Sequence, residues 1–224
     1  MRQGERGIVF LSVLGVFMAL ACGVADAGTE GPWVAEVTLA QGAVEVKPAG
    51  AVKWTTATER LKLREGDMLQ VGADGRAAVR LVNGNLVRLD AHTTVTITGT
   101  PGKKSLLIRM LEGAAHFFSN QPRSLNVETP FVNAVVEGTE FLVRVFADNA
   151  LVSVFHGQVR AENDQGSLTL TDGQSAVAYK GKAPALYTMV KQRDAAAWAL
   201  YYPPVDDFTG LSDVSLPGLE RYRE

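Results

Sequence analysis

The alternation of apolar and polar residues between Val34 and Tyr179 is typical of β-strands, whose successive side chains point to opposite faces. No apolar pattern in this range keeps helical spacing for three turns, and each recurrent glycine would cost a helix about 1 kcal/mol. The pattern therefore predicts an all-β domain over residues 34–182, with about 12 to 14 short strands. The positions expected to face its core are Val79, Leu81, Leu86, Leu89, Leu106, Ile108, Met110, Phe117, Val127, Val135, Phe141, Val143, Val152, Val154 and Val159.

Glycine recurs at the predicted starts of these strands, at Gly42, Gly66, Gly84, Gly113, Gly138, Gly157 and Gly173. The intervals range from 16 to 29 residues, whereas a solenoid with equal rungs would need a constant period. Asp74-Gly75, Asn83-Gly84 and Asp172-Gly173 accept positive φ, so these pairs are predicted to form hairpin or corner turns. The same alternation and turns occur in an irregular β-solenoid and in a β-sandwich, and both remain open.

The residues after the β-domain predict a short helix and a tail. Residues 187–202 contain the alanine-rich segment Met189 to Tyr201, whose apolar residues can form one stripe along a helix. Pro203-Pro204 ends this helix. Residues 203–224 are polar and rich in Gly, Ser and Pro, which predicts a linker or docking tail.

Residues 1–27 have the pattern of an export signal. Two arginines precede an apolar run from Gly7 to about Ala21, and Ala25-Asp26-Ala27 offers small residues where a signal peptidase cleaves. The alternative is a lipoprotein signal that ends in a lipidated Cys22, which would place the chain at the outer membrane. A membrane anchor is disfavoured, because the run spans about 15 residues and a bilayer needs about 20. We expect a periplasmic or otherwise exported protein that contacts membranes only through this segment or that lipid.

Composition excludes several functions. Cys22 is the only cysteine, so cleavage after Ala27 leaves no disulfide, thiolate metal site or cysteine nucleophile. The signal segment carries two basic and two acidic residues, so the mature chain keeps the net charge of −2. Such a near-neutral charge does not predict nucleic acid as a partner.

The residues that usually perform catalysis or bind metals are few and scattered. The only histidines, His92, His116 and His156, lie 24 and 40 residues apart, and the sequence has no nucleophile elbow, zinc-binding helix or phosphate loop. A hydrolase would require Asp90 and His92 to converge with a serine in a pocket. We therefore predict a non-enzymatic protein, with no catalytic, cofactor-binding or metal-binding residues.

Two segments resemble the FecR domain family. They are REGDMLQVGADGRAAVRLVNGNLVRL, with its Gly-Asp step and two glycine-led strands, and LNVETPFVNAVVEGTEFLVRV, which contains Gly138-Thr139-Glu140-Phe141. The resemblance covers about Val37 to Tyr179. In relatives of this kind a Trp-x-Leu-Tyr-Tyr-x-Pro segment, matched here from Trp198 to Pro204, often leads into tetratricopeptide helices.

The resemblance implies an all-β periplasmic domain that transmits or receives a protein contact. The family is named after a ferric citrate regulator whose periplasmic part carries a transport signal towards a sigma factor. In such regulators a cytoplasmic anti-sigma segment and a transmembrane helix precede the domain. Here only about seven residues precede the apolar run, so we do not expect direct transcriptional control.

The predicted function is therefore a cell-envelope protein-binding, signal-sensing or scaffolding module whose partner is an envelope protein. The motif residues Gly138, Thr139, Glu140 and Phe141 are expected to be structural, with the Thr139 hydroxyl bonded to a nearby main-chain group. Partner contacts are predicted at Glu140, Arg144, Trp198, Tyr201 and Tyr202. The alternative is a carbohydrate or peptidoglycan-binding module, in which Trp33 and Trp54 would stack on sugars.

Overall fold

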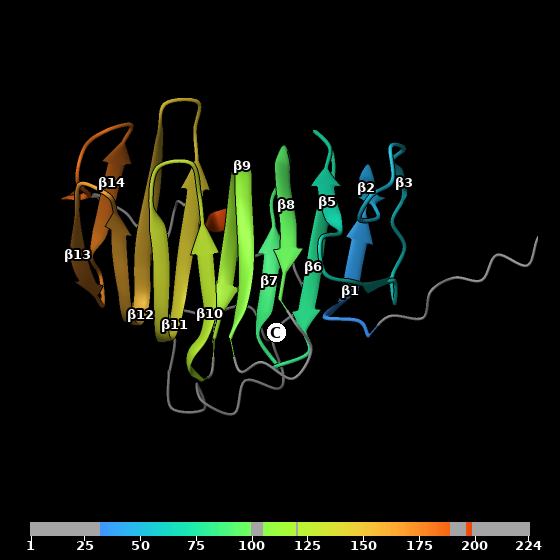
Figure 1. Ribbon diagram of the computed structural model, residues 1–224, viewed down its shortest axis with the longest axis horizontal. Coiled ribbons are helices and arrows are strands. Elements are labelled where there is room, and N and C mark those ends of the chain that lie inside the picture. Colours follow the sequence, from blue (N-terminus) through green and yellow to red (C-terminus); the bar gives the residue numbers. More distant parts are fainter. Residues whose placement is uncertain (1–31, 100–104, 120, 189–195, 199–224) are drawn as a thin grey trace, which may run out of the picture. The chain divides into compact units, whose positions relative to one another are not determined.

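The computed structural model describes residues 32–99, 105–119, 121–188 and 196–198, which all belong to one compact unit. These residues form fifteen strands (Figure 1). The strands are β1 (Ala35–Gln41), β2 (Val44–Lys47), β3 (Thr55–Thr56), β4 (Lys62–Leu63), β5 (Met68–Val71), β6 (Arg76–Leu81), β7 (Leu86–Leu89), β8 (Thr93–Thr98), β9 (Leu106–Phe118), β10 (Pro122–Glu128), β11 (Asn133–Val145), β12 (Asn149–Asn163), β13 (Gly166–Thr171), β14 (Ser175–Tyr179) and β15 (Ala185–Leu186).

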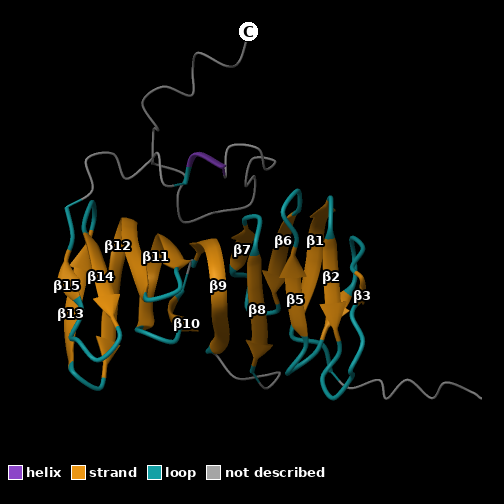
Figure 2. Ribbon diagram, turned by 90° about the horizontal axis from the view of Figure 1, so that it is seen from above, coloured by secondary structure: helices purple, strands orange, loops and turns teal. Residues whose placement is uncertain are grey.

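The strands form two layers, and the predicted all-β class is confirmed. The first layer has the order β4-β1-β6-β7-β9-β11-β12-β14-β15, and the second has the order β3-β2-β5-β8-β9-β10-β11-β12-β13. All pairs are antiparallel except β9 with β10. Figure 2 shows β7, β6 and β1 facing β8, β5 and β2 across the core. The strand count slightly exceeds the prediction, because β3, β4 and β15 are two-residue strands that carry no recognisable alternation.

Three long strands, β9, β11 and β12, belong to both layers. The second half of β9 pairs with β7, and its first half pairs with β8. Gly113, Gly138 and Gly157 lie where these strands cross between the layers. The expectation that they begin strands is therefore wrong. It is correct for Gly42, Gly66, Gly84 and Gly173, which lie between strands.

The crossing of β11 and β12 is built around a β-bulge. Glu137 pairs with Gln158 and Glu140 with His156, so Gly138 and Thr139 lie opposite the single residue Gly157. The extra residue reverses which side chains face the core. Counting back in twos from Phe141 predicts Val135 inside, but Ala134 and Val136 are the core residues and Val135 is only half-buried.

The core lies between the two layers. Its centre is the stacked pair of Phe117 and Phe141, whose ring centroids are 4.7 Å apart. Of the fifteen predicted core positions, all but Val135 and Leu86 are in this core. Leu86 is buried on the opposite face of β7 because Val87 and Leu89 take the inward positions.

Most of the predicted helix and all of the tail, 203–224, lie outside the described residues, as does the signal segment 1–27. Of the predicted helix 187–202, the structure describes residues 187–188 and 196–198. Residues 196–198 form a turn. Figure 2 shows this turn beside the layer that contains β7 and β11. In the described part of the chain, no helix is long and apolar enough to cross a membrane.

Candidate functional site

The Gly138–Phe141 motif lies at the crossing of β11 and β12. Gly138 has φ of +66°, a left-handed conformation that the bulge requires. The main-chain oxygen of Thr139 accepts a hydrogen bond from the N–H of Ser119 at 2.9 Å, which joins β11 to the end of β9. The Thr139 hydroxyl differs from our expectation, because its oxygen is buried without a hydrogen-bond partner among the described residues. Phe141 contributes its ring to the core.

The side chains of the first layer that point away from the core form what we call the outer face. One row crosses five strands in register and consists of Arg88, His116, Leu142, Ser153 and Ser175. Leu142 and Ser153 are 0% exposed, His116 is 5% exposed and Arg88 is 8% exposed. This row is buried although it lies outside the two-layer core, so the outer face is covered along this row.

His116 is a titratable group on this face whose pKa is shifted. Its Nε2 lies 2.9 Å from Glu140 Oε1, at ion-pair distance but outside hydrogen-bond geometry. Burial lowers the pKa of His116 from its ordinary value of 6.5, and the nearby Arg88 lowers it further, while Glu140 acts in the opposite direction. The imidazole is therefore neutral at pH 7, and the pair is not a charged salt bridge.

Aromatic rings surround His116. Its ring centroid lies 4.3 Å from that of Phe118, 5.3 Å from that of Phe155 and 6.5 Å from that of Trp198. The Arg88 guanidinium lies over the Phe118 ring, at 5.0 Å from its centroid. We call His116, Phe118 and Phe155 the aromatic socket, because the Phe118 and Phe155 rings pack around His116, the ring that Trp198 contacts.

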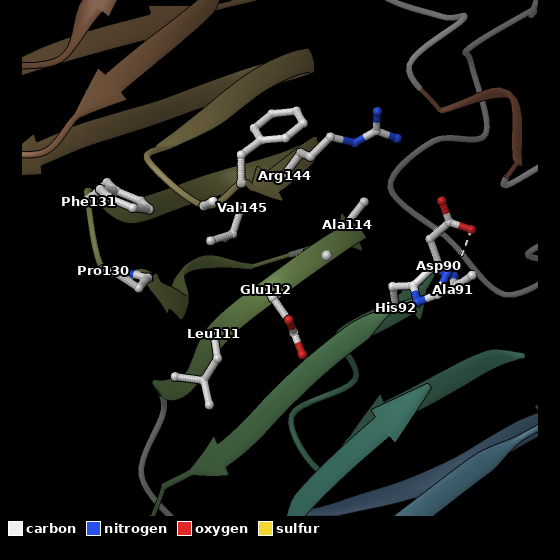
Figure 3. A pocket seen from close by; sticks show the side chains of 13 residues that line it. Asp90, Ala91, His92, Leu111, Glu112, Ala114, Pro130, Phe131, Arg144 and Val145 are labelled. Carbon is white, nitrogen blue, oxygen red and sulfur yellow. Dashed lines mark hydrogen bonds between the residues drawn. The ribbon is translucent and has the colours of Figure 1, made fainter. Parts of the chain in front are cut away.

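Arg144, a predicted partner contact, lines a hollow of about 580 Å³ beside the crossing strands (Figure 3). Leu111, Phe131 and Phe146 give this hollow an apolar part, and Leu111 and Phe146 are exposed. In the described chain no carboxylate lies at ion-pair distance from the Arg144 guanidinium.

Asp90 and His92, the residues of the hydrolase alternative, line the same hollow (Figure 3). Asp90 accepts a hydrogen bond from the N–H of Ala91, and His92 adopts a left-handed conformation with φ of +55° in an exposed turn. No serine is among the described residues that line the hollow. The triad that this alternative requires is therefore not assembled there.

The two tryptophans of the carbohydrate alternative lie just before strands of different layers. Trp33 precedes β1 and is 42% exposed, and Lys62 Nζ lies over its ring at 4.1 Å from the centroid. Trp54 precedes β3 and is half-buried, with Lys47 Nζ at 5.1 Å from its ring centroid. A lysine thus occupies one face of each ring, so a sugar would have to stack on the other face.

The outer strands of the layers differ in length. β3, β4 and β15 contain two residues each, whereas β13 contains six. Residues 167–171 read SLTLT and include neither a charged residue nor proline, the features that usually protect an edge strand. Gly166, the first residue of β13, has a close neighbour in the loop between β14 and β15, since a Cβ at Gly166 would lie 3.2 Å from Ala183 Cβ.

Sequence reasoning missed both the buried row on the outer face and the free edge of β13. The consecutive buried positions of β7, Leu86–Leu89, signal a strand covered on both sides, but they also fit a short core strand.

The structure brings Glu140 to the aromatic socket, where Trp198 also lies, whereas Arg144 lies at the hollow. Tyr201 and Tyr202 lie outside the described residues. Among the described residues no cluster of side chains has the composition of a metal site.

Comparisons with known proteins agree with this architecture. Residues 67–160 match the sequence profile of the family described as FecR protein, which confirms the predicted resemblance to the FecR domain family. The match includes the Gly138–Phe141 motif and every strand from β5 to β11. No curated protein matches the chain.

Two crystal structures of a Parabacteroides distasonis ATCC 8503 protein, provisionally assigned as an anti-sigma factor, are similar to this chain. Both have 20% sequence identity and a TM-score of 0.53, and both alignments cover 59% of this chain. The structures were determined at 1.65 Å and 2.50 Å, and 64% and 63% of those chains are covered, which is less than two thirds. At this identity the likeness shows the fold alone.

Proposed function

We propose that this protein is a non-enzymatic module of the cell envelope that senses or relays a signal by binding another envelope protein through the edge of β13. The FecR family and the fold it shares with an assigned anti-sigma factor support a regulatory role. The export signal predicted for residues 1–27 supports a place outside the cytoplasm.

The single observation that carries this proposal is the unprotected six-residue edge of β13. Natural sheets avoid such edges, because unpaired N–H and C=O groups recruit other strands. The other three outer strands are two residues long and offer little main chain for pairing. An edge left open is what β-strand addition requires, since the added strand completes the hydrogen bonds of the sheet.

The direction of the main-chain groups identifies which residues a partner strand would meet. The N–H of Thr171 donates to Gln174 Oε1, at 2.8 Å, instead of to β12. The N–H of Gly157 on β12 points towards Asp172, and it donates to Oδ1 at 2.6 Å. In an antiparallel ladder these directions alternate, so Ser167 and Thr169 direct their N–H and C=O groups away from β12, and both side chains are exposed.

The proposal is tested by photo-crosslinking in intact cells with the full chain. A photoreactive amino acid at Ser167 is combined with either Thr169→Pro or Thr169→Val. Proline removes the outward N–H without removing a bond to β12, and it obstructs an added strand, whereas valine keeps the N–H and suits a strand. We expect one defined envelope protein to be crosslinked with Thr169→Val and lost with Thr169→Pro.

The control places the photoreactive residue at Thr38, an exposed residue of β1 near the other end of the first layer. The same adduct at Thr38, an adduct that survives Thr169→Pro, or an adduct only with a second copy of the chain would contradict the proposal.

Carbohydrate binding is the second candidate, and the exposure of Trp33 favours it. A matched pair of variants separates the two functions. Trp33→Ala should abolish retention on purified peptidoglycan if this ring stacks on a sugar, and Trp33→Phe should preserve part of it. Retention that is unchanged in Trp33→Ala and in Trp54→Ala would exclude these rings as the binding surface.

A further inference from the structure

The centre of the outer face is as buried as the core, although no third layer of strands covers it in the described residues. Leu142 and Ser153 are fully buried, and Ser175, at 1% exposure, donates a hydrogen bond to the Ser153 hydroxyl at 2.9 Å. A sheet face open to water carries exposed polar side chains, as the second layer does at Arg109, which is exposed, and at Thr96, which is half-buried. The burial on the outer face therefore requires a covering segment.

The described residue that contacts the centre of this face from outside the sheets is Trp198. Its ring meets His116 at 75°, in the edge-to-face arrangement that aromatic pairs favour. Trp198 is itself half-buried, and it follows the last strand by twelve residues. The aromatic socket thus receives a side chain that is remote in sequence and belongs to the C-terminal segment.

We propose that the centre of the outer face is a docking surface whose resident occupant is the chain's own turn 196–198, held by the contact of the Trp198 ring with His116 in the aromatic socket. The apolar residues Leu86, Leu142 and Leu151 lie on the same face and extend the surface that such a segment covers. The neutral imidazole of His116 suits this role, because a charged ring would resist burial beneath an indole.

This occupancy has a consequence for the predicted partner contacts. The part of the Trp198 ring that lies against His116 cannot contact a partner, so a partner that uses this part must first detach the turn. The turn 196–198 then acts as a detachable latch, and the centre of the outer face becomes accessible when this latch is released. The β13 edge lies in the other layer, so this inference does not depend on the proposed function.

The latch is tested by the labelling rate of a single thiol in the full mature chain. Ser153→Cys places a nearly isosteric thiol on the outer face, and no other cysteine competes after removal or lipidation of Cys22. We expect Trp198→Ala to raise the labelling rate of this thiol by about tenfold or more, because the cover opens locally.

A core thiol distinguishes local opening from loss of stability. Ala150→Cys lies on the same strand but faces the core, so it is labelled only when the whole domain unfolds. Trp198→Ala should leave its rate unchanged, and Trp33→Ala should change neither rate. Equal acceleration of both thiols, or of neither thiol, by Trp198→Ala would overturn the inference.

A second measurement covers the case in which the cysteine variants fold poorly. In the Trp198→Ala chain, NMR titration should find the pKa of His116 moved upward towards 6.5, because burial is the main cause of its depression. An unchanged titration of His116 would also overturn the inference.

Discussion

Gly157 lies at the bend of β12, and a single substitution there is expected to destabilise the fold. It has φ of +89°, and a Cβ there would lie 2.4 Å from the Gly138 main-chain oxygen and 2.7 Å from Thr139 Cγ2. Gly138, on the facing strand, has φ of +66°, but a Cβ added there would meet no atom of the described residues within 4 Å. The two glycines therefore share the left-handed conformation and differ in crowding.

The expected magnitudes follow from this difference. Alanine in the left-handed region costs about 1–2 kcal/mol, and the reduced freedom of the unfolded chain returns about 0.4–1 kcal/mol. Gly138→Ala should therefore lower the free energy of unfolding by about 1 kcal/mol or less. Gly157→Ala adds a clash with main-chain atoms that cannot move away, which costs about 1–3 kcal/mol more. A domain of this size has only about 5–15 kcal/mol of stability, so the second loss is large.

Urea unfolding followed by far-UV circular dichroism measures both variants against the parent chain. We expect the transition midpoint of Gly157→Ala to fall clearly below that of Gly138→Ala, with an unchanged slope for both. Equal midpoints would refute the reasoning, because they would mean that the close approach of Gly157 to the Gly138 oxygen does not exist in solution.

Three further predictions concern the buried histidine, the core and the export signal. Since the folded pKa of His116 is lowered from 6.5, its contribution to stability should be complete above pH 6.5 and should decline as the pH falls below it, because the unfolded chain takes up the proton first. His116→Phe should remove that part of the pH dependence of urea midpoints between pH 8 and 5, and an unaltered profile would contradict it. Phe141→Ala should cost about 3–5 kcal/mol and Phe141→Leu clearly less, by the same unfolding assay, because the ring stacks on Phe117 in the fully buried core. Mass spectrometry of the protein recovered from cells should give the mass of a chain that begins at Gly28, whereas a lipidated chain that begins at Cys22 would establish the lipoprotein alternative.

Local patterns in the sequence were enough for the class and for most of the core. Alternation at Leu106, Ile108 and Met110 placed one face of β9 correctly, because side chains in a regular strand alternate whatever the strand pairs with. Asn83-Gly84 lies between β6 and β7, which pair directly, as its turn chemistry predicts. The resemblance to the FecR family likewise rested on local segments, and the match over 67–160 confirms it.

Local patterns could not predict which residues face the core near the crossings of β9, β11 and β12 between the layers. A glycine that permits a turn between strands also permits a bulge within one, and only the pairing of β11 with β12 decides between them. Val135 was misplaced for this reason, since one inserted residue reverses the inward and outward positions.

By itself, the sequence determined that this protein is an all-β chain with glycine-rich turns and a FecR-like motif, because those properties depend on neighbouring residues. Only the tertiary structure decided that Glu140 meets His116, that Trp198 lies at the aromatic socket and that β13 is left unpaired at one edge. These contacts join residues up to 82 positions apart, from His116 to Trp198. Their formation depends on the order of strands in two layers, which no local alternation of side chains specifies.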